Sequence, residues 1–352
     1  MGALAAPSVI CIRFGVRTTS LTDRWSERIR GRWVVPSDSA AIIPTMKIHA
    51  RSLRYFDTIR RSGSIREAAR RLHVASSAIN RQLLALEAEL GTPLFDRSPQ
   101  GLRLTAAGEL FSRHVINVLQ DEQRLAHELD ALRGLRRGEI RIVSVEGLNA
   151  EFLPTVLERM ISRYPAIKLH LSSGGSAQVA RELTNGEADV AIAFSLERNE
   201  ALQQWAVGRF ALGAIMRPDH PLAAQTQLGF ADCARHPLIL AGPQLSVHAQ
   251  MKPLLASHRK PLTVVLESAS IELARNLAIR GAGIAFQTRL GIEHDLREGR
   301  LVHRPLKPLS RLQAELGVYV RAARMLPPAL DAFIRIVADE LDRRAAQEQT
   351  AI

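Results

Sequence analysis

The chain has 352 residues, of which 46% are hydrophobic and 23% charged, and its formal net charge is +12 at pH 7. This length allows two or three domains with cores of their own, and this composition excludes a chain that is disordered throughout. The two cysteines, Cys11 and Cys233, are far apart in sequence, which excludes a disulfide framework and fits a reducing cytoplasm. The basic charge indicates a polyanionic partner or an anionic surface.

Residues 1–45 show no sustained periodicity and no secretion signal, that is, no basic start followed by an apolar core and a cleavage site. We interpret them as a disordered extension, or as sequence upstream of a true start at Met46. No run reaches the roughly 18 apolar residues that a membrane span needs. We therefore expect a soluble, cytoplasmic protein with no membrane partner.

Residues 63–91 have the layout of two short helices joined by a tight turn. Ser64 and Glu67 have capping-box spacing at the start of the first helix. The second helix has apolar residues at steps of four, three and four, and Gly91 then stands at its C-terminal end. The opposite face of the second helix begins with small polar groups and one arginine, which can reach base edges and phosphates: Ser76, Ser77, Asn80 and Arg81.

An earlier amphipathic helix and a later hairpin flank this pair. The first helix is predicted to end near Gly63, and the turn Ser98–Gly101 joins two short strands that carry Arg97 and Arg103. From Lys47 to Leu104 there are eleven basic and five acidic side chains. Residues 46–104 are therefore predicted to be a basic, winged helix-turn-helix domain that binds double-stranded DNA.

The sequence from Phe56 to Gly108 resembles the DNA-binding domain of the LysR-type transcriptional regulators. The matching segments are Glu67-Ala68-Ala69-Arg70-Arg71-Leu72, Asn80-Arg81-Gln82, Leu90-Gly91-Thr92-Pro93-Leu94-Phe95 and Leu104-Thr105-Ala106-Ala107-Gly108. The chain departs from the family pattern at Ala75, where a capping Ser is usual, at Ser76, where Gln is common, and at Asn80, where Ser is common. The resemblance implies a sequence-specific regulator with RNA polymerase as a further partner.

A long helix is predicted after Thr105, within a linker segment at 105–138. Its apolar residues follow coiled-coil spacing if Glu122 takes one seam position: Phe111, Val115, Val118, Leu125, Leu129 and Leu132. We expect this helix to join two copies in a homodimer or homotetramer, since a helix-turn-helix protein contacts two half-sites as a dimer. The alternative is an ordinary amphipathic helix packed on its own domain. Two glycines and three arginines at 133–138 are predicted to form a hinge.

From residue 139 strands alternate with helices, which predicts a mainly parallel sheet covered by helices. This part also resembles the LysR family, through Gly186–Ile192, Asp219–Ala223 and Arg280–Ile284. The resemblance implies an effector domain of two α/β lobes, like a type 2 periplasmic binding protein. We place lobe I at 139–208 and 306–352, and lobe II at 209–305, with crossings near 207–212 and 304–308.

A small-molecule effector is expected beyond the carboxyl ends of the strands, between the lobes. The candidate residues are Glu146, Gly147, Asn149, Ser173, Ser176, Ser195, Ser268, Ser270 and Phe286. Helix N-termini there favour a small carboxylate. Each serine could equally serve only as a helix cap. Glu146 would repel a carboxylate unless an arginine offsets its charge, so an effector that carries an amine stays open.

Three other kinds of protein compete with a regulator. An enzyme is disfavoured because the chain has no nucleophile elbow, no P-loop and no His/Cys metal spacing, and we expect no metal and no cofactor. A cytoplasmic solute-binding module would not need the basic helix-turn-helix. An architectural DNA-binding protein without a ligand would not need the two lobes. The sequence favours a homo-oligomeric transcriptional regulator that responds to an effector.

Overall fold

The computed structural model describes residues 49–99, 101–132, 138–197, 199–308, 312–322 and 326–351. The predictions for residues 1–45, and for the hinge except Gly138, fall outside these ranges. None of the described helices is long and apolar enough to cross a membrane.

The N-terminal domain is a winged helix-turn-helix, as predicted. Its helices are α1 (Ala50–Ser62), α2 (Ile65–Leu72) and α3 (Ser76–Leu90), and its wing is the antiparallel hairpin of β1 (Phe95–Ser98) and β2 (Gly101–Leu104). Phe56 of α1 lies at the centre of the core, with its ring 5.2 Å from that of Phe95 and 4.9 Å from that of Phe111. These aromatic contacts hold the wing and the following helix on α1.

The ends of these helices explain why they begin and end where they do. The Ser64 hydroxyl accepts a hydrogen bond from the Glu67 amide at 3.5 Å. The Glu67 carboxylate pairs with Arg70 and Arg71. These ion pairs take the place of the hydrogen bond from the Ser64 amide to the Glu67 carboxylate that the predicted capping box would add. Gly91 ends α3 with φ +67°, a conformation that favours glycine.

The two halves of helix α4 (Ala106–Leu132) have different surroundings. The Thr105 hydroxyl caps its first turn by accepting from the Gly108 amide at 3.0 Å. Phe111 and Val115 are buried in the core of the DNA-binding domain, whereas Leu125 is 56% and Leu129 46% exposed. The first half therefore packs on its own domain, and the second half leaves its apolar side chains on the surface.

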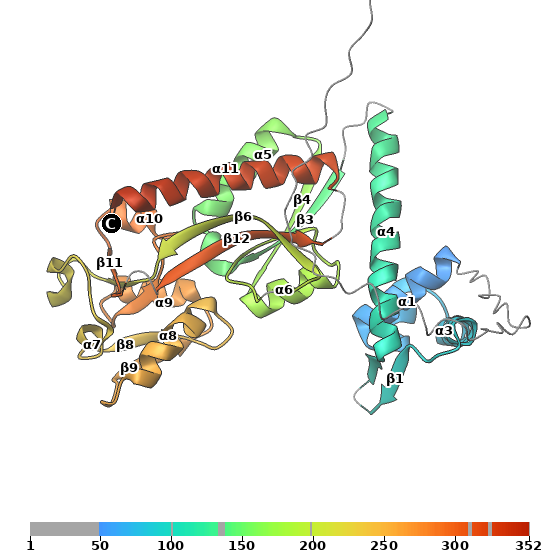
Figure 1. Cartoon of the computed structure of the whole chain (residues 1–352), viewed down its shortest axis with the longest axis horizontal. Coiled ribbons are helices and arrows are strands. Elements are labelled where there is room, and N and C mark those ends of the chain that lie inside the picture. Colours follow the sequence, from blue (N-terminus) through green and yellow to red (C-terminus); the bar gives the residue numbers. More distant parts are fainter. Residues whose placement is uncertain are drawn as a thin grey trace, which may run out of the picture. The chain divides into compact units, whose positions relative to one another are not determined.

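Lobe I contains a mixed five-stranded sheet in the order β4-β3-β5-β12-β6. Its strands are β3 (Gly138–Val145), β4 (Ile167–Gly174), β5 (Val190–Phe194), β6 (Leu202–Ala211) and β12 (Gln313–Arg321). The first three in that order are parallel, and β12 is antiparallel to β5 and to β6. Of these five strands only β12 runs against the others, in a sheet that was predicted to be mainly parallel. In Figure 1, α5 (Phe152–Arg163) and α11 (Pro328–Ala351) cover one face and α6 (Ser176–Thr184) the other.

Lobe II is a smaller sheet with helices around it. Strand β7 (Gly213–Met216) lies between β10 (Ala285–Gln287) and β11 (Val302–Pro305), and β8 (Leu238–Ala241) runs parallel to β9 (Val264–Ser268). A bridge from Leu238 to Ile284 links the β8–β9 pair to the chain next to the three-stranded sheet. The helices are α7 (Phe230–Cys233), α8 (Ser246–Ser257), α9 (Ile271–Ile279) and α10 (Glu293–Arg297), with short 3-10 turns η1 (Glu146–Leu148) and η2 (Pro221–Ala224) elsewhere in the domain.

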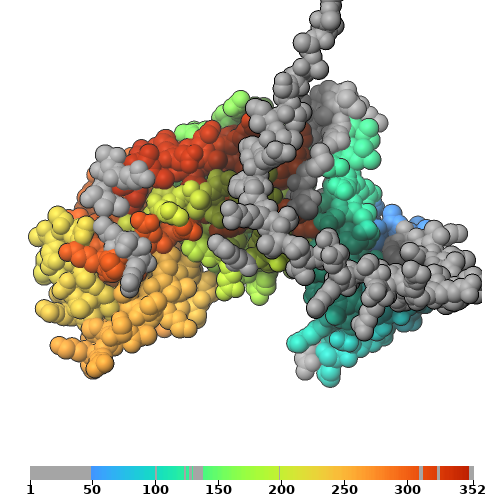
Figure 2. All heavy atoms as spheres, viewed as in Figure 1, coloured from blue at the N-terminus to red at the C-terminus, as the bar shows by residue number. Residues whose placement is uncertain are grey.

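The chain crosses between the lobes twice, and the crossings lie side by side. Leu212 separates β6 of lobe I from β7 of lobe II, and its carbonyl accepts from the Leu306 amide at 3.0 Å. The Leu212 amide donates to the Leu312 carbonyl at 2.9 Å on the return path. Lobe I therefore continues to Ala211, beyond residue 208. In Figure 2 the yellow and orange surface of lobe II adjoins the green and red surface of lobe I.

Candidate functional site

The exposed face of α3 brings together four of the residues predicted to contact DNA. Ser76, Ser77 and Arg81 are exposed and Asn80 is half-buried. The Asn80 side-chain oxygen accepts a hydrogen bond from the Arg97 guanidinium at 3.1 Å. A hydrogen bond between side chains therefore links the polar face of α3 to the wing.

The arginines of this surface keep their charge unbalanced. Within the described ranges, no carboxylate lies at ion-pair distance from Arg81, Arg97 or Arg103, and both wing arginines are exposed. By contrast, Asp57 holds Arg60 at 2.7 Å and Arg61 at 2.8 Å on α1. Guanidinium groups without acidic partners are free to bind phosphate oxygens or base edges.

A cavity of about 540 Å³ opens between the lobes, a size within the range of small-molecule sites. Lobe I supplies η1 and the residues just before α5, and lobe II supplies α9, the end of β10 and α10. A second, mainly apolar cavity of about 50 Å³ adjoins it. The two cavities share part of their lining: Glu146, Gly147, Ile271 and Gln287.

Five of the predicted effector residues lie at these cavities. Glu146 and Gly147 line both, Asn149 lines the larger and Ser176 the smaller. Ser270 lines neither cavity but contacts the shared wall, because its hydroxyl donates to the Glu146 carboxylate at 2.7 Å. The residues after β3 and at the start of α6 are brought together because the carboxyl ends of parallel strands open at the same edge of the lobe I sheet, and Ser270 joins them from lobe II.

The other four predicted effector residues line neither cavity. Ser173 is exposed and exchanges hydrogen bonds with Asn149 at 3.1 and 3.2 Å. Ser268 accepts from the Ser270 amide at 3.0 Å in a local turn, and Ser195 lines neither cavity. Phe286 is buried in the lobe II core against Phe230, with ring centroids 6.0 Å apart. The strand's alternation explains this correction, because it turns Gln287 toward the cavities and Phe286 away from them.

Sequence reasoning missed the charged residues that lobe II contributes to the larger cavity. They lie on α9, on α10 and just after α10: Glu272, Arg275, His294, Asp295, Arg297 and Arg300. Helix α10 has only five residues, too few for an apolar period to show in the sequence. The acidic Glu293 and Asp295 in its first turn were the only local sign of its start.

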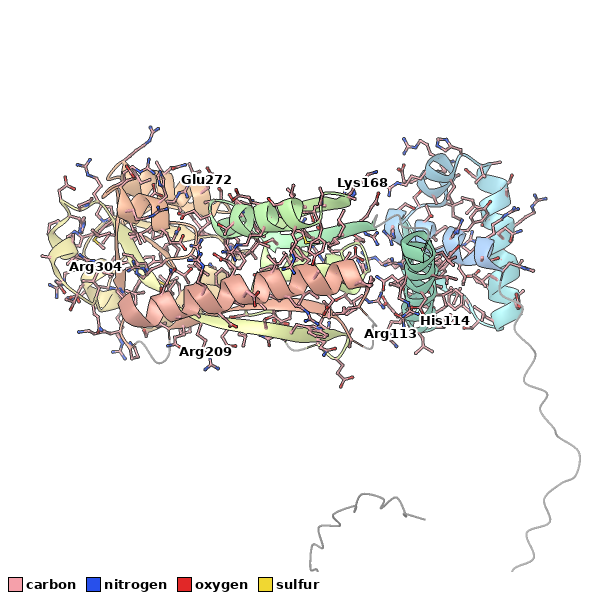
Figure 3. All side chains as sticks on the ribbon, turned by 90° about the horizontal axis from the view of Figure 1, so that it is seen from above. Arg113, His114, Lys168, Arg209, Glu272 and Arg304 are labelled. Carbon is pink, nitrogen blue, oxygen red and sulfur yellow. The ribbon has the colours of Figure 1, made fainter. Side chains whose placement is uncertain are left out.

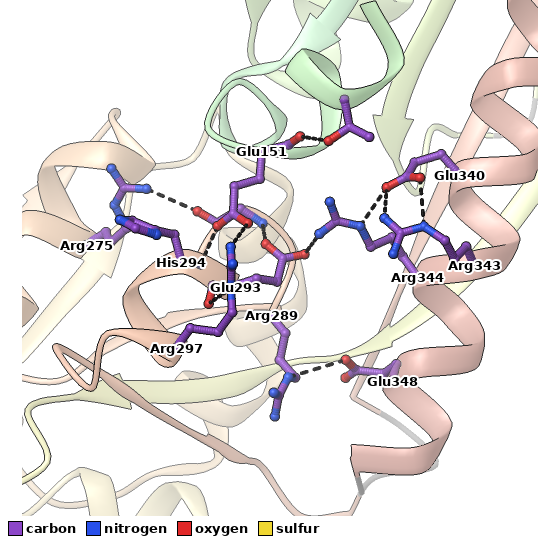
Figure 4. Close-up of polar contacts among 12 residues, drawn as sticks. Glu151, Arg275, Arg289, Glu293, His294, Arg297, Glu340, Arg343, Arg344 and Glu348 are labelled. Carbon is purple, nitrogen blue, oxygen red and sulfur yellow. Dashed lines mark hydrogen bonds and ion pairs between the residues drawn. The ribbon is translucent and has the colours of Figure 1, made fainter. Parts of the chain in front are cut away.

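Ion pairs connect the lobes beside this cavity (Figure 4). The Glu151 carboxylate of lobe I accepts from the His294 amide at 2.5 Å and pairs with Arg297 at 3.4 Å. Arg344 of α11 pairs with Glu293 of α10 and, at 2.7 Å, with Glu340 of its own helix. These contacts tie α10 to lobe I from two sides.

Burial and the arginines act in opposite directions on the carboxylates of this network. Burial raises the pKa of Glu293, although Arg344 opposes the shift. Burial alone would also raise the pKa of Glu340, but hydrogen bonds from Arg343 and Arg344 hold that pKa below its ordinary value. The charged form of Glu340 is therefore favoured, and Arg344 is the arginine that contacts both carboxylates.

A winged helix-turn-helix, a long linker helix and a two-lobed α/β domain with a cavity between its lobes define a DNA-binding transcriptional regulator with an effector domain. The chain belongs to the LysR family. The family model for the bacterial regulatory helix-turn-helix protein, lysR family, matches residues 50–109, and the model for the LysR substrate binding domain matches residues 133–342. Proteins of this family are regulators that bind DNA and small-molecule effectors, not enzymes.

Curated relatives resemble the chain over most of its length. The HTH-type transcriptional regulator CbbR of Rhizobium meliloti (strain 1021) is 28% identical over 290 residues, which cover 82% of this chain and 91% of the relative. The RuBisCO operon transcriptional regulator of Allochromatium vinosum is 26% identical over 298 residues, which cover 85% and 98%.

Solved structures share the fold. A full-length OxyR variant from Pseudomonas aeruginosa matches with a TM-score of 0.64 at 22% identity, over 84% of this chain and 94% of that chain. Full-length CbnR in complex with its target DNA matches with a TM-score of 0.52 at 21% identity, over 83% and 100%. At these identities the likeness establishes the architecture only.

Proposed function

We propose that this chain is a cytoplasmic, homo-oligomeric regulator whose α3 enters the major groove of an operator. The observation that carries the proposal is the polar face of α3, where Arg81 has no acidic partner within the described ranges and Asn80 is bonded to the wing. In this arrangement Ser76, Ser77, Asn80 and Arg81 contact base edges. Arg97 and Arg103 hold the adjacent phosphates or the minor groove.

The second half of α4 supports assembly into a homodimer, and pairs of dimers would form a homotetramer. Its exposed Leu125 and Leu129 give a second copy an apolar surface. The two winged helix-turn-helix domains of one dimer would contact the two halves of an inverted repeat. RNA polymerase is the further partner through which DNA binding would alter transcription.

The interlobe cavity is proposed to hold the effector. Its wall combines residues of both lobes, so a bound molecule would contact both and change the balance between open and closed arrangements of the lobes. This cavity also disfavours an architectural DNA-binding protein, which has no need of a chamber of this size.

Selection of genome fragments tests the DNA-binding part. Purified protein is mixed with sheared genomic DNA at moderate salt, and the retained fragments are sequenced. We expect enrichment of an inverted repeat, with an affinity that falls by about 0.9 log unit per log unit of salt for each neutralised phosphate. Retention without any sequence preference would support the architectural alternative, and no retention would refute DNA binding.

Arg81→Ala locates the contact surface. Losing a bidentate base contact should weaken binding to the selected repeat by about tenfold or more while the circular dichroism spectrum stays unchanged. The matched control is Arg259→Ala, an exposed arginine of lobe II, which should bind the repeat like the parent protein. Equal footprints for the Arg81 variant and the parent would refute the assignment of α3.

A further inference from the structure

One carboxylate in the lining of the larger cavity has no cation to balance it. The lining contains three arginines, and each lies within ion-pair distance of a carboxylate of the same lining. The pairs are Arg275 with Glu272 at 3.7 Å and with Asp295 at 3.6 Å, Arg297 with Glu151 at 3.4 Å, and Arg300 with Asp295 at 2.6 Å. Glu146 is the acidic lining residue left outside these pairs.

Glu146 begins η1 directly after β3, and its side chain is half-buried. One carboxylate oxygen accepts a hydrogen bond from the Ser270 hydroxyl of the other lobe at 2.7 Å. A hydroxyl is neutral, so this bond orients the carboxylate without cancelling its charge. Over the part of the chain that the structure describes, no Lys, Arg or His lies at ion-pair distance from it.

Glu146 also lies where a ligand would meet it. It belongs to the wall that both cavities share, so a molecule in either cavity contacts the same carboxylate. The smaller cavity around it is lined mainly by apolar side chains, among them Val145, Phe194 and Leu290. This side of the wall suits a hydrocarbon group, and the carboxylate suits a positive charge.

The helix end nearest Glu146, the start of α9, is already capped by a side chain. Helix α9 begins at Ile271, and the Ser270 hydroxyl caps it by accepting from the Leu273 amide at 3.2 Å. The negative charge of Glu146 lies against this same cap. A ligand carboxylate here would stand beside a second carboxylate, a like-charge contact that disfavours both charged forms.

We propose that the effector of this protein carries a positively charged nitrogen, a primary ammonium or a guanidinium, that pairs with Glu146. This inference rests on the proposed function of the cavity as the effector site and gives that effector a chemical class. The cation replaces the missing partner of Glu146, and the hydrocarbon part of the molecule packs toward Val145 and Leu290. A carboxylate group placed beside Glu146 is disfavoured.

Calorimetry with matched probes tests the proposal on the full chain. The probes are phenethylamine and cadaverine, L-arginine, and the corresponding carboxylates hydrocinnamate and glutarate. We expect binding of at least one cationic probe and none of the two carboxylates. Glu146→Gln, which keeps an oxygen to accept from Ser270, should weaken binding of that cation by about tenfold or more.

The matched control is Glu158→Gln, which removes an exposed carboxylate of α5 outside both cavities and should change the affinity by less than about twofold. Binding of a carboxylate but of no cation, no binding of any cationic probe, or an unchanged cation affinity in the Glu146 variant would each overturn the inference. Retention of the selected DNA by the same preparations reports separately on the proposed function, so the two failures are distinguishable.

Discussion

His303 is a single residue whose burial makes the stability of lobe II depend on pH. Its imidazole Nε2 lies 3.1 Å from the Gln287 carbonyl, and its Nδ1 is buried without a hydrogen-bond partner. Burial, together with Arg289 and Arg304, lowers the pKa of His303 from 6.5 to about 3. The folded protein therefore holds this ring neutral at a pH where the unfolded chain would protonate it.

The sign of the effect follows from proton uptake. Between pH 6.5 and about 3 the unfolded chain binds a proton at His303 that the folded chain does not bind. The contribution of neutral His303 to the free energy of unfolding is complete above pH 6.5. It is lost as the pH falls, by about 1.4 kcal/mol per pH unit at most. Urea unfolding of the parent and of His303→Gln at neutral and mildly acidic pH should show the difference between their unfolding free energies shrinking on acidification. A difference that stays constant would contradict this account.

For single residues, the common face of α3 was easier to predict from the sequence than the lining of the cavity. Ser76 and Arg81 belong to one helix, so their common face follows from the period of 3.6 residues. The bond between Glu146 and Ser270 joins residues 124 positions apart. Such a pair depends on how two lobes close, and no local pattern contains that information.

Among the helices, α11 shows how burial decides the value of an ion pair. Arg344 is 10% exposed and serves Glu293 and Glu340, whereas Arg335 of the same helix is 76% exposed and pairs with Asp331 at 2.9 Å. Removing a cation from a buried pair leaves a carboxylate in a medium that solvates it poorly. Water screens and solvates an exposed pair.

Two alanine variants compare the buried ion pair with the exposed ion pair of α11. Arg344→Ala should lower the free energy of unfolding by about 2–4 kcal/mol, because Glu293 loses the partner shown in Figure 4. Arg335→Ala should lower it by less than about 1 kcal/mol. Urea denaturation followed by circular dichroism measures both, and similar losses in the two variants would contradict the role given to Arg344.

Strand β6 (Leu202–Ala211) has no clear signal in the sequence. Strand β6 begins at Leu202 and continues through two glutamines and Trp205, where no alternation of apolar and polar residues marks a strand. It is an edge strand, held by its pairing with β12, so only tertiary contacts reveal it. Long helices with regular apolar spacing, such as α3 and α4, were predicted because their signal is local.

For the whole molecule, α4 is the element through which we expect two copies to meet. Glu122 would interrupt an apolar seam, but it pairs with Arg54 of its own domain at 2.5 Å. Its charge is therefore balanced within one chain. Arg113 and His114 also lie on this helix (Figure 3), ahead of the exposed leucines.

The double variant Leu125→Glu with Leu129→Glu places two negative charges on this surface. We expect the mass measured by light scattering to fall toward that of one chain, because like charges would face each other across the seam. Binding to an inverted repeat should weaken accordingly. Val265→Glu, at an exposed position of β9, is the control for adding a charge to an apolar surface residue. An unchanged mass in the double variant would place the dimer contact elsewhere.

Cys233 lies fully buried in lobe II, and burial, helped by Asp232, raises the pKa of its thiol to about 12. The thiolate is the reactive form, so this cysteine resists alkylation while the lobe is folded. In a chain that begins at Met46, Cys233 is the one cysteine. The rate at which a thiol reagent alkylates Cys233 then reports how often lobe II opens transiently. A ligand that binds only the folded lobe would lower this alkylation rate as its occupancy rises. The rate therefore gives a screen for effectors that needs no DNA.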